Sequence, residues 1–303
     1  MSARDLLEPS PQLLTRTQFI LLLGSPYDYV LLQTRDRLIS NDVRVYLVQN
    51  VALVNISAPF GVDDVEAKIV IEGESLSIRT AKAILVSQVM AGTKDLMDGS
   101  DAHYVEQEVF ASWLALLSMA PCRIINRPSA RVPVMLYNSI QLRSFARSLG
   151  VPTVDEEICS KRELVRRKQR GENLVCLDLS NQQPFCLVDD YRIEGGRLYS
   201  IIEVTCDATY AITVRIAEEF LSFLYKPSQG IFRMPDAFQN QLKDSSRTLL
   251  DALNLSFAYC VHAFQPFQQK VPEFTRLYTE TPPFLPMNVT DTVVDKLIDE
   301  LKR

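Results

Sequence analysis

Polar residues follow two strand-like runs of this chain, at positions where an α/β protein would bind a ligand. Gly24 and Ser25 come directly after the apolar run 17–23, and Asn126 and Arg127 end a second strand-like run. Ligands of open α/β sheets bind beyond the carboxyl ends of the strands, so these four residues are candidate ligand-binding residues. The same residue types also form ordinary turns, in which a Ser or Asn side chain bonds its own backbone. Both interpretations stay open.

A pair of aspartates provides a second candidate. Asp189 and Asp190 follow the apolar run PFCLV, and a pair of carboxylates could act as general acid and base. Adjacent residues of a strand point to opposite faces of a sheet, so the two are not expected to act on one substrate. They therefore stand as ligand-binding candidates, and no catalytic residue is assigned. A single histidine after a strand, His262, is expected to be structural.

A basic segment could contact a partner. Residues 161–170 (KRELVRRKQR) hold six basic residues in ten, and clustered Arg side chains can bind carboxylates. Arg166, Arg167 and Arg170 are therefore candidates for contact with an acidic peptide or protein. The alternative is a solvated helix face.

These residues need elements to position them, and the first third of the chain has the pattern of a doubly wound sheet. The continuous apolar run 17–23 fits a buried parallel strand, and 29–39 has helical spacing before a strand at 43–48. A helix over 104–119 leads to a strand at 123–126. A second helix over 138–149 is closed by Gly150.

The rest of the chain predicts a more strand-rich architecture. Residues 174–214 alternate and are rich in β-formers, so they predict one small antiparallel sheet with a hairpin at 194–196. A helix over 238–253 follows, then strands at 256–262 and 274–279 and a last helix over 290–302. We expect Asn288 or Thr290 to cap that helix.

Composition excludes several classes of protein. The net charge of −5 gives no global support to a nucleic-acid or anionic-membrane partner. No apolar run reaches 18 residues, and the first residues lack a hydrophobic signal core, so we expect a cytoplasmic protein. The six cysteines are scattered without a CxxC pair, which predicts no metal site. A homo-oligomer is compatible with these features.

The segment from Ile125 to Thr153 also resembles a known family. Its pattern INRP…YN-x-x-QLR-x-x-A-x-x-LGVPT is similar to the hinge of ATP-grasp ligases, in particular the microviridin-type peptide ligases, the graspetide synthetases. The resemblance implies an α/β, ATP-grasp-like fold. It would comprise a parallel-sheet first domain (1–125), a hinge with a reduced β-rich central module (126–215) and a mixed C-terminal part (216–303).

Several residues that the resemblance would require for ATP are missing. The hinge helix has Asn138, but Ser139 follows it where the family has a phosphate-binding Lys. Asp178 lies near the place of a second Lys, and its charge would repel phosphate. The glycine-rich loop is reduced to residues 180–183 (SNQQ).

The metal ligands implied by the resemblance are also incomplete. Val261 stands where an Asp is expected, and Pro282 replaces the Asn of the terminal E-x-N pattern, leaving Glu280 as a ligand-binding candidate. One oxygen ligand is too few to hold Mg²⁺ against phosphates. Without a cation, Glu280 should be solvated or paired with an Arg such as Arg276.

Three functions follow from this combination of kept fold and missing ligands. The first is a degenerate ATP-grasp-like protein, a pseudoenzyme that binds a peptide, a small molecule or a partner enzyme in peptide or natural-product maturation, with no cofactor. The alternative is an active ATP-dependent ligase that forms an amide or ester on a peptide and uses ATP and Mg²⁺. A third is a structural subunit of a larger complex.

Overall fold

The computed structural model describes most of the chain, and everything below refers to the described residues. They are 18–57, 67–89, 101–128, 139–154, 157–171, 174–178, 186–187, 198–203, 209–226, 229–264, 271–282 and 285–303.

A four-stranded parallel sheet forms the first part of the fold. Its strand order is β2-β1-β6-β7, with β1 Phe19–Leu23, β2 Val45–Val48, β6 Ala81–Val86 and β7 Arg123–Ile125. All five residues of β1 are buried, as the continuous apolar run predicted, because both faces of this sheet are covered. Helices α2 (Tyr29–Ser40) and α3 (Asp101–Met119) connect strands of this sheet. A small antiparallel sheet lies beside them and consists of β3 (Asn55–Ser57), β4 (Lys68–Ile71) and β5 (Glu74–Ser77). The short helices η1 (Val51–Leu53) and η2 (Ile78–Thr80) flank this small sheet in the sequence.

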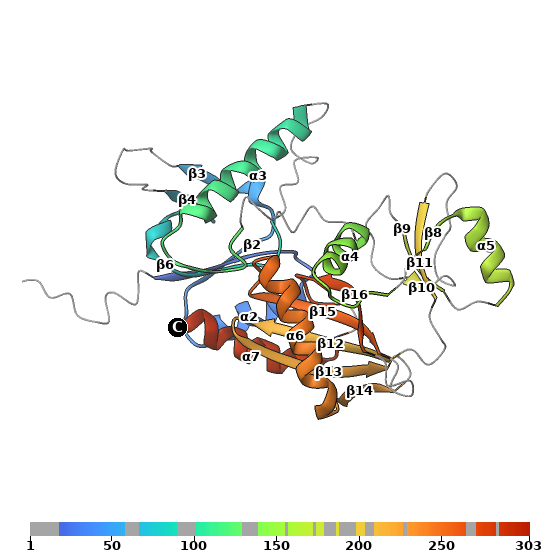
Figure 1. The fold of residues 1–303 in the computed structure, drawn as a ribbon. Coiled ribbons are helices and arrows are strands. Elements are labelled where there is room, and N and C mark those ends of the chain that lie inside the picture. The colour runs from blue at the N-terminus through green and yellow to red at the C-terminus, as the bar shows by residue number, and fades with distance from the viewer. Residues whose placement is uncertain are drawn as a thin grey trace, which may run out of the picture.

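A five-stranded antiparallel sheet forms the C-terminal part. Its order is β14-β13-β12-β15-β16, with β12 Thr209–Ile216, β13 Glu219–Lys226, β14 Gly230–Arg233, β15 Phe257–Phe264 and β16 Glu273–Tyr278. Helix α7 (Met287–Lys302) packs on one face and helix α6 (Asp236–Ala252) on the other. Helix α4 (Ser139–Ser148) packs beside β16 (Figure 1).

A smaller antiparallel sheet and a helix lie at one side of the molecule, at the right of Figure 1. The strand order is β10-β9-β11-β8, with β8 Glu157–Ser160, β9 Leu174–Asp178, β10 Cys186–Leu187 and β11 Leu198–Glu203. Helix α5 (Lys161–Gln169) follows β8 directly. Among the described residues, none of the helices combines the length and apolar composition that a bilayer-spanning helix requires.

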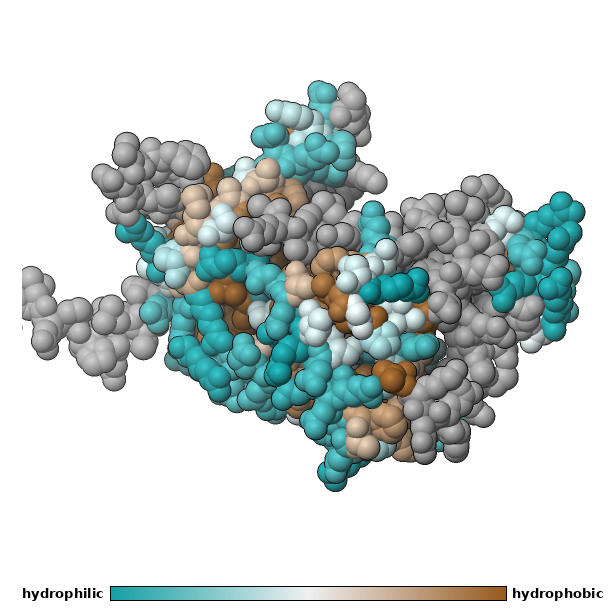
Figure 2. Space-filling model, viewed as in Figure 1, coloured by the Kyte–Doolittle hydropathy of each residue, from teal (hydrophilic) through white to brown (hydrophobic). Residues whose placement is uncertain are grey.

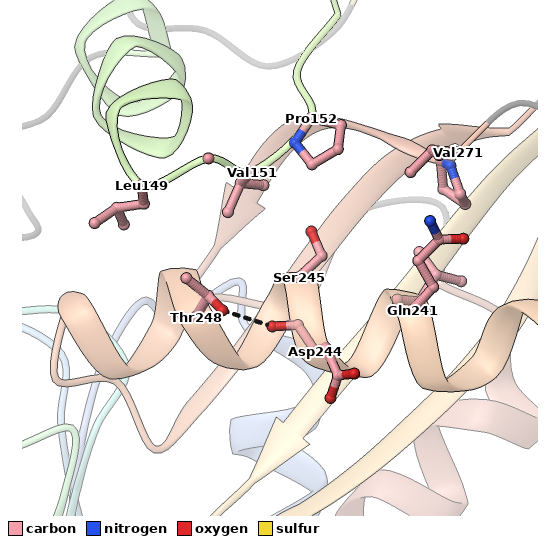
Figure 3. A pocket seen from close by; sticks show the side chains of 11 residues that line it. Leu149, Val151, Pro152, Gln241, Asp244, Ser245, Thr248 and Val271 are labelled. Atoms are coloured by element: carbon pink, nitrogen blue, oxygen red, sulfur yellow. Dashed lines mark hydrogen bonds between the residues drawn. The ribbon is translucent and has the colours of Figure 1, made fainter.

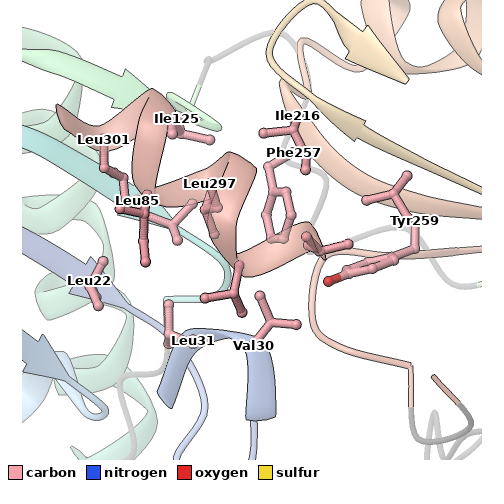
Figure 4. Close-up of a cluster of buried hydrophobic side chains, with 14 of the residues drawn as sticks. Leu22, Val30, Leu31, Leu85, Ile125, Ile216, Phe257, Tyr259, Leu297 and Leu301 are labelled. Atoms are coloured by element: carbon pink, nitrogen blue, oxygen red, sulfur yellow. The ribbon is translucent and has the colours of Figure 1, made fainter. Parts of the chain in front are cut away.

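One hydrophobic core joins the parallel sheet to the C-terminal sheet. Leu22 and Leu85 of the parallel sheet, Leu297 of α7 and Phe257 of β15 all belong to it and are buried. Figure 4 shows these side chains converging around α7. Helix α7 therefore lies between the two sheets, although it is the last helix in the sequence.

The structure corrects two predictions about the elements. The run 209–216 pairs with β13 and β15 in the C-terminal sheet, so its assignment to the small sheet of 174–214 was wrong; period-two alternation is the same in either sheet. Asn288 and Thr290 lie inside α7, and Pro286 precedes the helix without a side-chain cap. The Gly150 stop is confirmed, since that residue has φ +76° two positions after the end of α4.

Candidate functional site

The turn after β1 is shaped by a close approach of helix α2. A Cβ at Gly24 would lie 2.6 Å from a methyl carbon of Leu31 and 3.1 Å from the Cβ of Ser87. Any larger residue would push α2 away from the sheet. The Ser25 hydroxyl accepts a 3.2 Å bond from the N–H of Tyr27, so its side chain helps to form the turn.

The buried residue Asp28, which sequence reasoning missed, lies at the carboxyl-end edge of the parallel sheet, in the turn between β1 and α2. Asp28 caps α2 by accepting from the N–H of Leu31 at 3.3 Å. Its other oxygen accepts from the Ser87 hydroxyl at 2.8 Å. The oxygen that caps α2 also accepts hydrogen bonds from the backbone N–H of Thr281, at 3.4 Å, and from its hydroxyl. Asp28 therefore ties β1 and β6 to the segment that follows β16. An Asp directly before a helical run is a recognised capping pattern, which could have identified this residue.

Glu280 lies beside Asp28 and is half-buried. Burial raises the pKa of its carboxyl group, and the Asp28 charge adds to the effect. The expectation that Glu280 is solvated or paired with Arg276 is wrong, because a neighbouring guanidinium would lower this pKa. The chain bends at Thr279 and Glu280, directly after β16, and Asp28 is the charged neighbour that acts on Glu280.

Asn126 joins three strands. Its amide nitrogen donates to the carbonyls of Val86 (3.1 Å) and Phe257 (2.7 Å). Its amide oxygen accepts from the N–H groups of Ser256 (3.0 Å) and Phe257 (2.8 Å). Two donors and two acceptors are all that an Asn side chain offers. The backbone has φ +60°, a conformation that Asn adopts more readily than most residues. The contacts of Asn126 are thus contacts within the protein.

Arg127 holds the end of helix α3. One guanidinium nitrogen donates to the carbonyls of Leu117 (2.9 Å) and Ser118 (3.1 Å). The other donates to Ala120 (3.1 Å) and Cys122 (2.8 Å). The last carbonyls of a helix have no partner within the helix, and a cation there is favourable. The structure therefore gives Asn126 and Arg127 structural roles next to the edge of the sheet.

The strand pair β15–β16 presents a cation where the resemblance implied metal ligands. Val261 of β15 lies opposite Arg276 of β16. The Arg276 guanidinium stacks 4.9 Å from the ring centre of Tyr278. Burial lowers the pKa of Arg276 and raises that of Tyr278. Because Glu280 lies beyond the end of β16, the structure does not bring it opposite Val261.

Two further tyrosines extend this cluster. Tyr210 of β12 lies opposite Tyr225 of β13, in the same sheet as Arg276. Burial raises the pKa of Tyr210 to about 12, and the nearby Tyr278 and Tyr225 contribute. The result is a face with phenol hydroxyls and the Arg276 guanidinium, which suits an anion better than a metal ion. Among the residues that the structure describes, no group of three His, Cys, Asp or Glu side chains could hold a metal ion.

The basic segment forms helix α5. Arg166 and Arg170 are exposed and Arg167 is half-buried. Arg166 lies 3.8 Å from Glu163, one turn earlier, and Figure 2 shows a hydrophilic surface over α5 at the right of the molecule. The exposure of Arg166 and Arg170 is compatible with contact to an acidic partner. It is equally compatible with a solvated helix face.

Three candidates fall outside the described residues. They are Asn138, Asp189 and Asp190. The remaining candidates divide into two groups. Gly24, Ser25 and Glu280 come together around Asp28, whereas the arginines of α5 belong to the small sheet at the other side of the molecule (Figure 1).

No protein-family model matches the sequence, and no curated protein sequence does. Solved structures do match. A RiPP-associated ATP-grasp ligase of Chryseobacterium gregarium, in complex with ADP and a leader and core peptide, has 11% identity and a TM-score of 0.64, over 94% of this chain and 96% of that one. The macrocyclase MdnC of Microcystis aeruginosa, bound with precursor peptide MdnA, has 13% identity and a TM-score of 0.62, over 93% and 99%.

A third similar structure is the ATP-grasp ligase PsnB, complexed with precursor peptide PsnA2 and AMPPNP. It has 12% identity and a TM-score of 0.62, over 93% of this chain and 97% of that one. At such identities the likeness concerns the fold, which covers almost the whole of each chain. The chain therefore has the ATP-grasp fold, as the resemblance of its hinge segment implied.

Proposed function

We propose that this chain is a degenerate ATP-grasp-like protein that binds a peptide, and that it does not hold Mg²⁺ and ATP as a ligase does. The peptide half of the proposal is supported by the three similar structures described above, each of which contains a precursor peptide or a leader and core peptide. The exposed arginines of α5 provide a surface for acidic groups of such a peptide or of a partner enzyme.

The observation that carries the second half is the pair Val261–Arg276. Mg²⁺ needs carboxylate or amide oxygens around it. A valine offers none, and a guanidinium repels a divalent cation. A triphosphate could still approach Arg276, but it would lack the metal that normally neutralises it and positions its terminal phosphate.

Calorimetry tests this proposal directly. ATP with Mg²⁺, titrated to millimolar concentration, should give weak binding or none. Short peptides encoded beside the gene should bind, and binding should weaken when Arg166, Arg167 and Arg170 are all replaced by Glu. A micromolar dissociation constant for ATP–Mg²⁺ would overturn the degenerate-site proposal.

The alternative function is an active ATP-dependent ligase with a rebuilt site. One observation favours it: two carboxylates, Asp28 and Glu280, lie close together where the ends of β1 and β6 meet the segment after β16. Glu280→Gln distinguishes the alternatives, because it keeps the shape and removes the charge. If the variant stays folded but product formation from a peptide and ATP is lost, the ligase function holds.

A further inference from the structure

A groove lies between helix α6 and the segment that follows helix α4. Its volume is about 250 Å³. Six of its residues are apolar: Leu149, Val151, Pro152, Leu242, Val271 and Pro272. Figure 3 shows the groove between the Val151–Pro152 segment and the α6 residues Gln241, Asp244, Ser245 and Thr248. None of these residues belongs to the edge around Asp28 or to the Val261–Arg276 face.

The floor of the groove holds a buried hydroxyl without a partner. The Ser245 hydroxyl is buried and forms no hydrogen bond among the described residues, and Figure 3 shows it pointing from α6 toward Val151. Buried polar groups in folded proteins are nearly always paired. A ligand group in the groove would supply the missing partner of the Ser245 hydroxyl.

The other lining residues define the chemistry of that group. Proline and valine side chains form the walls, and Val271 is exposed, so an apolar portion of the ligand would fit between them. Asp244 is the charged residue among those that line the groove, and it is exposed. A positive charge beside the apolar portion would therefore be favoured there, and a negative one would be disfavoured.

We propose that this groove binds an apolar side chain of a peptide, with the peptide backbone bonding to the Ser245 hydroxyl and a neighbouring Lys or Arg of the peptide facing Asp244. The inference rests on the proposed peptide-binding function. It specifies where on the protein the peptide binds and which side chains the peptide presents there. A groove of this volume accommodates one side chain and its flanking amides, which sets the residue specificity of a longer peptide held elsewhere by other contacts.

Methyl and amide NMR of the full chain provides the test. The probe is the peptide acetyl-Gly-Gly-Leu-Lys-Gly-Gly-amide, with Leu→Gly and Lys→Glu versions as comparisons. We expect saturable shifts at Val151, Leu242 and Val271 with the first peptide, binding weaker by at least threefold with the Glu version, and no saturation with the Gly version. Asp244→Lys should reverse the preference between the Lys and Glu peptides.

Matched variants keep the test falsifiable. Thr248→Trp should block the groove, whereas Asn240→Trp, an exposed α6 residue that does not line it, should leave binding unchanged. Equal effects of both variants, or shifts that avoid the groove, would overturn the inference. If a peptide encoded beside the gene still binds Thr248→Trp with unchanged affinity, the groove inference falls and the proposed function stands. If that peptide fails to bind the unaltered chain, the proposed function itself falls.

Discussion

His262 makes the stability of this protein depend on pH. The side chain is fully buried on β15 and packs edge-on against Phe274 at 5.8 Å. Burial lowers its pKa from 6.5 to about 4, because the cost of charging the ring in an apolar interior outweighs the favourable backbone interactions with Ala211 and Cys260. Between these two pKa values, the unfolded chain therefore binds a proton at His262 that the folded protein does not bind.

The size of the effect follows from the two pKa values. A difference between 6.5 and about 4 corresponds to about 3 kcal/mol, at 1.36 kcal/mol for each unit. This stability is fully present above pH 6.5. It declines as the pH falls, by up to about 1.4 kcal/mol for each pH unit, until the folded protein is protonated near pH 4.

Urea unfolding of the protein and of His262→Phe, compared at each pH from 7.5 to 4, isolates this contribution from that of the carboxylates. Phenylalanine keeps a ring of similar size and cannot take up a proton. The variant should match or exceed the stability of the unaltered protein at pH 7.5. Its advantage should grow by about 3 kcal/mol by pH 4. A stability difference that stays constant across this range would refute the buried, neutral state of His262.

Three other substitutions test the edge of the parallel sheet. Asn126→Ala should lower the free energy of unfolding by about 3 kcal/mol or more in urea titrations, because buried backbone groups of β6 and β15 lose their partners; a loss below about 1 kcal/mol would contradict the joint described here. Gly24→Ala should cost about 1–3 kcal/mol in the same assay, because its Cβ would meet Leu31, and an unchanged midpoint would show that α2 can shift freely. Glu280→Gln should raise the thermal midpoint at pH 7.5 and lose that advantage on acidification, because a raised pKa means that the ionised carboxylate opposes folding; a lower midpoint at pH 7.5 would reveal a cation partner.

Local structure was predictable where neighbouring residues determine it. The apolar run of β1, the helix over α3 and the Gly150 stop all follow from periodicity and capping. The strand ends at Gly24 and Asn126 were also found. These features depend on residues a few positions apart, so the sequence displays them.

Contacts between distant residues were not predictable. Asp28 bonds to Thr281, 253 positions away, and Asn126 bonds to Phe257, 131 positions away. No local pattern reveals such a pairing, so the sequence left Asn126 open between a turn residue and a ligand contact, and Asp28 was not identified. The strands β13 and β14 were missed, and β12 was placed in the wrong sheet, because alternation identifies a strand but not its neighbours.

The position of helix α7 has a consequence for how the protein folds during synthesis. Part of one face of the parallel sheet is covered by a helix that begins at Met287, far from the sheet in the sequence. At about 5–20 residues per second, the roughly 260 residues between β1 and α7 take on the order of 10–50 s to emerge. Helix α2 can already pack on the part of this face over β1 and β2, but Leu85 and the other β6 residues of this face lack the helix that covers them until α7 emerges. The nascent chain is thus exposed to aggregation until α7 is released, and expression yield should respond to chaperone supply more strongly than the stability of the finished protein would suggest.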